Sequence, residues 1–202
     1  MAAVLASFRV QHTTYLAQDQ VVELQQNLRV AMEMLSRDFR SAGYDPTGGA
    51  GAGTITATDI PNTQIVFTRD LDGSGGTYID QSHSTENDPN EKISYRLNTA
   101  PPALGRAIGD SPVHQPVADN IVALELLYLL ADGTTVLNPA AADLDNIRGV
   151  QISMLAQAAA ADPGYNDNIE YETASGAIWG PFNDGFRRRM LIQTVMFRNL
   201  GL

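Results

Sequence analysis

Residues 18–43 of this chain read QDQVVELQQNLRVAMEMLSRDFRSAG. Apolar side chains recur there at intervals of three or four residues, the spacing that places them on one face of an α-helix. No glycine or proline interrupts the pattern before Gly43, which suits a helix end, and Pro46 prevents the helix from resuming. This apolar stripe needs a surface to pack against, and it consists of Val21, Leu24, Leu28, Ala31, Leu35, Phe39 and Ala42.

The helical pattern also continues towards the first residue, through Leu5, Phe8, Tyr15 and Leu16. A helix of about forty residues spans ~60 Å, whereas a compact chain of this length is only ~40 Å across. We therefore expect residues 1–43 to form an amino-terminal helix whose first part protrudes. The rest of the helix should pack with residues 44–202, an antiparallel β head, as one globular domain. Shortening Leu5 or Phe8 should then have little effect on the stability of the head.

After the glycine-rich stretch 45–53, the period of the apolar pattern changes from helical to alternating, which predicts β-strands. Residues 120–130 are long enough for a buried helix, but their alternation and the Asp132-Gly133 turn favour a strand in a hairpin. One helix followed by antiparallel strands is the α+β pattern, with the helix on the sheet. The expected strands are a short one from Ile55 and residues 64–69, 92–97, 103–108, 120–130, 134–137, 147–157 and 187–199.

Composition limits the class of protein. The 202 residues are 44% hydrophobic and 18% charged, which fits one globular domain or at most two. The net charge of −10 argues against a nucleic-acid binder, and the absence of cysteine excludes disulfides and thiolate chemistry. The chain has no apolar run of membrane-spanning length, and its start lacks the features of a signal peptide.

Two blocks of the helix carry a family resemblance: ELQQNLR (residues 23–29) and LSRDFRSAGYDP (residues 35–46). They resemble the segment that follows the membrane helix in PilW-type minor pilins of type IV pili, which are related to the J pseudopilin of type II secretion. The resemblance covers nearly the whole chain. Further matching segments are LGR at 104–106, QPVADNI at 115–121, DNIRGVQIS at 145–153 and the ending from Arg188-Arg189 to FRNL at 197–200.

The resemblance implies a pilin-like fold and a structural, non-enzymatic subunit that takes part in pilus assembly and priming at or near the filament tip. The expected partners are other minor pilins or pseudopilins, met through a helix surface at Leu5, Phe8, Tyr15 and Leu16, and neither nucleic acid nor a small-molecule substrate. The expected location is the inner membrane facing the periplasm, then the extracellular pilus. Nothing before Phe8 matches the prepilin cleavage site and apolar stretch, so we expect that the membrane segment has been removed.

Two alternatives share this architecture. One is a type II secretion pseudopilin of the J type, which the sequence does not separate from a minor pilin. The other is a pilus-associated adhesin or binding module, in which the loops at residues 70–91 and 158–168 recognise a ligand.

Residues 70–81, DLDGSGGTYIDQ, form the densest polar cluster. Asp70, Asp72 and Ser74, followed by a turn glycine, match the opening of a calcium loop. Gln81 stands where an EF-hand needs glutamate, so the prediction is a looser Ca²⁺ site that also uses Asp80. Other acids available to it are Glu86, Asp88 and Glu91. The alternative is a solvated Asp-Gly turn, and calcium is the only cofactor expected.

Other polar residues give no catalytic pattern. The three histidines are far apart in sequence, which argues against a transition-metal site, and we expect each of them at the surface. There is no nucleophile motif and no phosphate-binding glycine loop, so we expect no enzyme. The basic cluster at residues 187–189 should pair with local acids such as Asp184, or alternatively meet an acidic partner.

Overall fold

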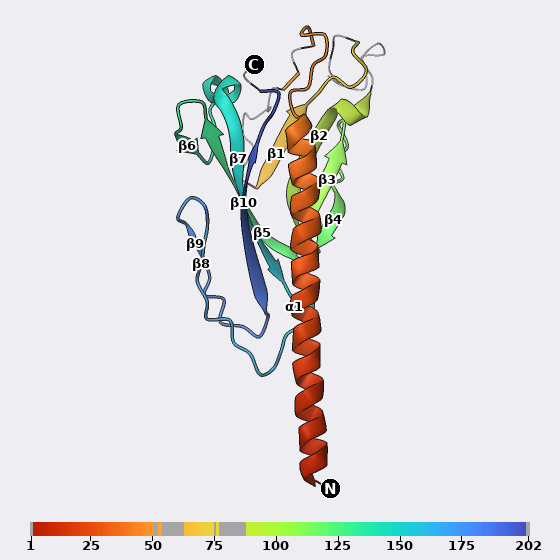
Figure 1. Cartoon of the computed structure of the whole chain (residues 1–202), viewed down its shortest axis with the longest axis vertical. Coiled ribbons are helices and arrows are strands. Elements are labelled where there is room, and N and C mark those ends of the chain that lie inside the picture. Colours follow the sequence, from red (N-terminus) through yellow and green to blue (C-terminus); the bar gives the residue numbers. More distant parts are fainter. Residues whose placement is uncertain (1, 51, 54–62, 75, 77–87, 201–202) are drawn as a thin grey trace.

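A computed structural model of the chain describes residues 2–50, 52–53, 63–74, 76 and 88–200. One long helix, α1 (Ala2–Ser41), precedes the strands and two short 3₁₀ turns, η1 (Pro89–Glu91) and η2 (Ala141–Asn146) (Figure 1). The strands are β1 (Gln64–Thr68), β2 (Lys92–Thr99), β3 (Pro102–Ile108), β4 (Gln115–Asp119), β5 (Ile121–Leu130), β6 (Thr135–Val136), β7 (Ile147–Gln157), β8 (Tyr171–Glu172), β9 (Ile178–Trp179) and β10 (Arg188–Met196).

The helix has two parts, as the sequence predicts. Its amino-terminal half extends beyond the strands (Figure 1), and Tyr15 there is 67% exposed. Its carboxyl half is buried along the predicted stripe, and Gly43 has the left-handed φ of 74° that its position at the helix end requires. Within the described residues, no helix combines the length and apolar character that crossing a membrane requires. The buried stripe residues are Leu24, Leu28, Ala31, Leu35, Phe39 and Ala42, joined by Met32.

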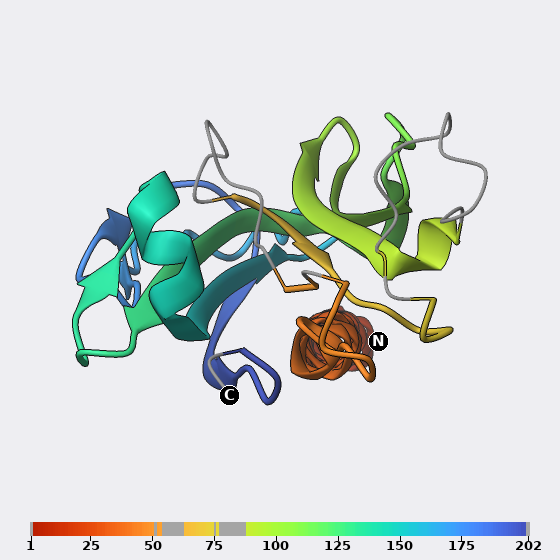
Figure 2. The same ribbon diagram turned by 90° about the horizontal axis from the view of Figure 1, so that it is seen from above.

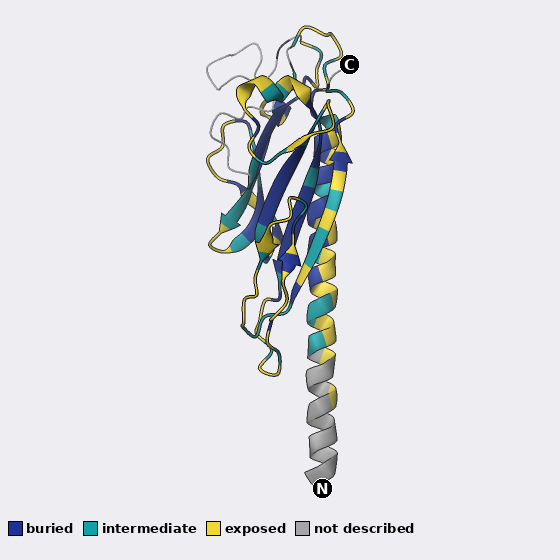
Figure 3. Ribbon diagram, turned by 90° about the vertical axis from the view of Figure 1, so that its left-hand side faces the viewer, coloured by how far each residue is buried: buried dark blue, intermediate teal, exposed yellow. Residues whose placement is uncertain are grey.

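The strands form two main antiparallel sheets instead of the single sheet expected. The first has the order β1-β2-β3-β4 and the second β10-β7-β5-β6, while β8 and β9 make a small ribbon. Seen end-on in Figure 2, α1 lies on the same side of both sheets. It contacts β4 of one sheet and β10 and β7 of the other. In Figure 3, buried residues run along the strands beside the carboxyl half of α1. The core is therefore shared by the helix and two sheets.

Phe39 lies at the centre of this core. Its ring centroid is 5.6 Å from that of Phe67 on β1 and 6.1 Å from that of Tyr95 on β2, both edge to face. It is also 5.8 Å from the ring of Phe197, which follows β10. Edge-to-face pairs add stability beyond the area they bury. One helix side chain thus connects both sheets.

Asp38, next to Phe39, is a buried charge that the sequence pattern does not reveal. Its side chain is 6% exposed, and Oδ2 accepts hydrogen bonds of 2.8 Å from the Tyr95 hydroxyl and from Arg106 Nε. Burial, followed by the charge of Asp38, raises the pKa of the Tyr95 hydroxyl, which therefore remains a donor. The network ties α1 to β2 and β3.

Most predicted strands are confirmed, including residues 120–130, whose chain turns at Gly133 with a φ of 85°. The alternation of apolar and polar residues in 147–157 predicts a strand with one face in water, but this is wrong for β7, because Ser153 and Leu155 on the more polar face are fully buried. The segment carrying β8 and β9 covers it, and Ala174 N donates to Ser153 Oγ at 2.9 Å. The strands β4, β8 and β9 were not predicted, and the strand expected from Ile55 lies outside the described residues.

The buried stripe predicts a stability difference along the helix. Leu35→Ala should lower the free energy of unfolding by ~2–5 kcal/mol, because the fully buried side chain leaves a cavity between the helix and the sheets. Tyr15→Ala, at an exposed position, should change it by less than about 0.5 kcal/mol. Denaturant unfolding of the two variants measures both effects. Equal destabilisation would contradict the division of the helix into two parts.

Asp38→Ala should cost about 3–5 kcal/mol, because it leaves the guanidinium of Arg106 and the hydroxyl of Tyr95 without their acceptor. Arg37→Ala is the matched control. The Arg37 side chain also lies close to Asp38, with Nε 3.5 Å from Oδ1, but it is 68% exposed. Thermal unfolding followed by circular dichroism compares them. Equal melting points would show that the network contributes no stability.

Candidate functional site

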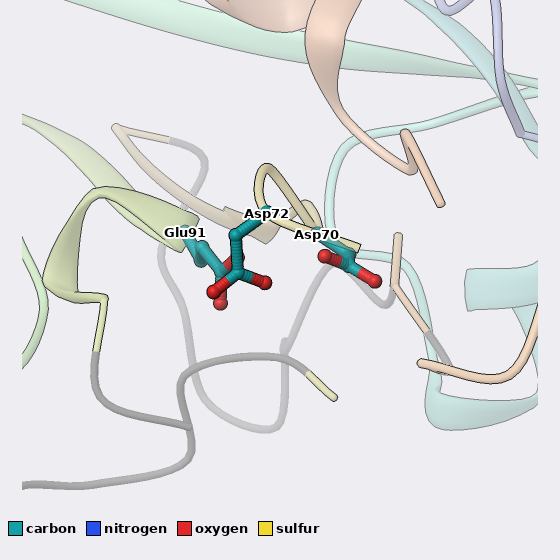
Figure 4. A group of neighbouring side chains, drawn as sticks. All are labelled: Asp70, Asp72 and Glu91. Carbon is teal, nitrogen blue, oxygen red and sulfur yellow. The ribbon is translucent and has the colours of Figure 1, made fainter. Parts of the chain in front are cut away.

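The predicted calcium loop follows β1, and the pairing of β1 with β2 determines what it meets. Thr68 at the end of β1 is opposite Lys92 at the start of β2. The chain just after β1 therefore lies beside the chain just before β2. Carboxylate oxygens of Asp70, Asp72 and Glu91 all lie within 4.8 Å of one another (Figure 4). The register of one strand pair thus brings together acids about twenty residues apart.

Backbone N–H groups hold these carboxylates in place. Asp70 accepts from Gly73 N at 2.7 Å, Asp72 from Ser74 N at 2.8 Å, and Glu91 from Leu71 N at 2.8 Å. Asp70 and Glu91 are buried, while Asp72 is exposed. Because both loop aspartates and Glu91 take their hydrogen bonds from the loop itself, the three carboxylates are positioned by the local backbone.

The pKa values of the buried Glu91 and the exposed Asp72 shift in opposite directions. Burial is the main cause of the raised pKa of Glu91; the N–H of Leu71 opposes the rise, and the charges of Asp72 and Asp70 add to it. The pKa of Asp72 is lowered, mainly by the N–H of Ser74. Gathering acids at one place is unfavourable unless a cation compensates for their charge.

The cluster has the chemistry that Ca²⁺ prefers. Calcium binds 6–8 oxygens at about 2.3–2.6 Å, so two oxygens on one ion lie up to ~5 Å apart. The spacing of the three carboxylates fits this range. The structure brings together two of the predicted ligands, Asp70 and Asp72, and one of the other acids named for the site, Glu91, while Ser74 donates its backbone N–H to Asp72. Asp80 lies outside the described residues, and Asp88 instead caps η1 by accepting from Asn90 N.

Calcium provides a direct test of this loop. Millimolar Ca²⁺ should raise the melting temperature of the purified chain, because an ion that binds only the folded state stabilises it by about 2.7 kcal/mol at roughly one hundred times its Kd. Asp72→Asn should abolish most of the shift. Asp132→Asn is the matched control, because Asp132 makes a similar turn by accepting from Thr134 N without belonging to an acidic cluster.

Calorimetry in the presence of calcium and in the presence of chelator measures the melting temperatures of the parent chain and of both variants. A parent chain that does not respond to calcium, or an Asp72→Asn chain that responds equally, would leave this loop as a solvated turn.

The predicted partner surface lies on the protruding half of α1. Leu5, Phe8, Tyr15 and Leu16 all fall within the helix. Tyr15 is exposed, and the side chains of the other three are outside the described residues. This surface stays a prediction.

The basic cluster divides between two environments. Arg188 is buried and pairs with Asp167 at 2.8 Å and Asp184 at 2.7 Å, and Arg187 pairs with Asp162 at 2.7 Å. These contacts match the expectation of pairing with local acids. Arg189 is exposed and forms no ion pair within the part of the chain that the structure describes.

His114 is buried, which corrects the expectation that it lies at the surface. Its Nε2 is 2.8 Å from Ser94 Oγ, and burial is the main cause of its lowered pKa. Ser94 is buried as well. Sequence analysis missed the pair because its members come from different strands or loops and share no motif. His12 and His83 have no described side chains.

Comparison with known proteins places the chain among pilin-like folds. Residues 17–109 match the family model described as prepilin peptidase-dependent protein B. The structure is similar to a type IV-like pilin from Thermus thermophilus, with a TM-score of 0.58 and 17% sequence identity over 88% of this chain and 98% of that one. A search of curated proteins found no match. The chain therefore has a type IV pilin-like fold, and residues 17–109 are similar in sequence to the prepilin peptidase-dependent protein B family.

Proposed function

We propose that this chain is a minor pilin: a structural subunit that joins other pilins at or near the tip of a type IV pilus and helps to start its assembly. It works outside the inner membrane, first in the periplasm and then in the filament. The described structure supports this proposal mainly through α1, of which one half is buried in the head and the other half extends from it.

The division of α1 matches the task of a filament subunit. A helix segment that extends beyond the strands of its own chain is available to other helices, and a helix bundle buries apolar side chains that a single helix leaves exposed. Tyr15 is exposed in this half. The head packs firmly around the other half through Phe39 and Asp38, so contacts made by the projecting helix would be transmitted to the head as a rigid body.

The amino-terminal match to a prepilin peptidase-dependent family supports the same assignment, as does the pilin-like fold. A chain that acts as a filament subunit works by contact with its neighbours. Variants of the projecting part of α1 should therefore change assembly and leave the folding of the head unchanged.

Introducing a charge on the projecting helix tests this proposal. Phe8→Asp and Tyr15→Asp, made in the gene at its native locus, should reduce recovery of the subunit in sheared filaments and lower the number of pili, because a carboxylate in an apolar helix interface costs several kcal/mol. The matched control is Val113→Asp, which adds the same charge at a 57% exposed position on the head. Electron microscopy and immunoblotting of filaments measure the outcome.

The other outcomes identify the alternatives. Normal pili together with failed protein secretion would replace the minor pilin with a secretion pseudopilin. Normal pilus number with loss of surface binding only would indicate an adhesin. Unchanged filaments and unchanged recovery of the subunit would contradict a helix-mediated assembly role.

A further inference from the structure

A groove of about 850 Å³ runs between the carboxyl half of α1 and β10. Arg29, Arg37 and Arg40 line its helix side, and Arg189 lines its strand side. It lies on the head part of the helix, away from the projecting half. The groove is therefore separate from the helix surface to which the proposed function assigns a role.

The charge of the groove is opposite to that of the whole chain. Four arginines line it against one acid, Glu33, although the chain carries a net charge of −10. All four arginines are exposed, and among the described residues only Arg37 of the four forms an ion pair, with Asp38 at 3.5 Å. Within the described ranges, the other three arginines form no ion pair. Such a local concentration of unpaired positive charge favours a negatively charged partner.

The strand side of the groove has free backbone groups. β10 is the last strand of its sheet and pairs only with β7 among the described strands. Phe197 N donates to Arg148 O, and Arg187 O accepts from Ala158 N, so odd-numbered residues exchange hydrogen bonds with β7. Antiparallel pairing alternates and the register has no shift. The N–H and C=O groups of residues 190, 192, 194 and 196 therefore point towards the free edge.

The outer face of β10 also exposes large apolar side chains. Ile192 is 45% exposed and Met196 is 51% exposed. Edge strands of stable monomers are usually protected by proline, lysine or a bulge. Residues 190–196 have none of these devices. An added strand would satisfy the backbone groups and cover both side chains.

The dimensions of the groove suit a short extended segment. Arg29 and Arg40 are eleven positions apart on the helix, or ~16 Å along its axis. An extended strand covers that distance in about five residues, and every second side chain points to the same side. Acidic residues at alternate positions would then face the arginines of the helix while the backbone paired with β10.

We propose that this groove receives an extended acidic segment of a partner protein, which adds as a strand to the free edge of β10 and places its carboxylates against Arg29, Arg40 and Arg189. The backbone of β10 supplies the register, and the arginines supply the preference for acids. The occupant is a segment of another protein with alternating acidic residues.

A labelled, end-capped peptide that alternates threonine with glutamate is the probe, and fluorescence anisotropy with the purified chain measures its Kd. Arg29→Glu and Arg189→Glu should each weaken binding about tenfold, because each reverses a charge that faces the peptide. Arg96→Glu, the same change on the other sheet, is the matched control and should leave the Kd unchanged. Raising the ionic strength from about 0.1 M to about 1 M should also weaken binding, since the Debye length falls from about 10 Å to about 3 Å.

Two further probes test the strand geometry. A peptide methylated on alternate backbone nitrogens, on the edge that faces β10, should lose binding, while methylation of the other edge should not. Thr194→Pro removes an outward N–H from β10 and should have the same effect, with its melting curve as the folding control. The methylated peptides keep this test valid if the proline variant does not fold.

Four results would overturn the proposal: no binding of the acidic peptide, equal binding of a peptide with lysine in place of glutamate, no effect of the Arg29 and Arg189 reversals, or no effect of methylation on either edge. Sedimentation of the chain alone tests the other possible occupant of the groove, a second copy of the chain. Self-association that Arg189→Glu abolishes would make the occupant a second copy and would reject a separate acidic partner.

Discussion

The packing of one helix face against two sheets at once is the constraint on which the rest of the structure depends. Phe39 contacts aromatic rings from β1, β2 and the segment after β10, and Asp38 binds side chains of β2 and β3. The two sheets share this helix as their common partner. Because the contacts come from consecutive helix residues, rotation of α1 about its axis would break the aromatic and the ionic contacts together.

This packing also determines which surfaces remain outside the core. The buried stripe ends where the strands end, so the amino-terminal half of α1 continues into solvent (Figure 1). Along the buried half, the residues beside the stripe border β10 and form the groove that Arg29 and Arg40 line. The same helix therefore supplies three regions: a buried face that holds the head together, a projecting end, and a positively charged border. The buried face contacts both sheets, whereas the projecting end and the positively charged border lie outside the core.

The register of β1 and β2 determines which residues meet at the acidic cluster. The loop after β1 and the turn η1 before β2 are brought together because the two strands pair in an antiparallel register. Backbone N–H groups of the loop hold Asp70, Asp72 and Glu91, and one carboxylate oxygen of each lies within 4.8 Å of the others. Burial is the main cause of the raised pKa of Glu91, and the charges of Asp72 and Asp70 add to it. A bound cation would compensate for the repulsion among these charges.

Local periodicity alone determined much of this molecule. The 3.6-residue spacing from Val21 to Ala42 was enough to predict a helix, its buried face and its end at Gly43, because helix geometry relates sequence spacing directly to a face. The alternation in residues 120–130 likewise predicted a strand. Contacts between distant segments were decided only by the tertiary structure. The meeting of Glu91 with Asp70 depends on strand register, the burial of Asp38 on Arg106 from another strand, and the burial of Ser153 on a later loop that covers its face. Such contacts produce no periodic pattern in the sequence, because they depend on which elements become neighbours when the chain folds.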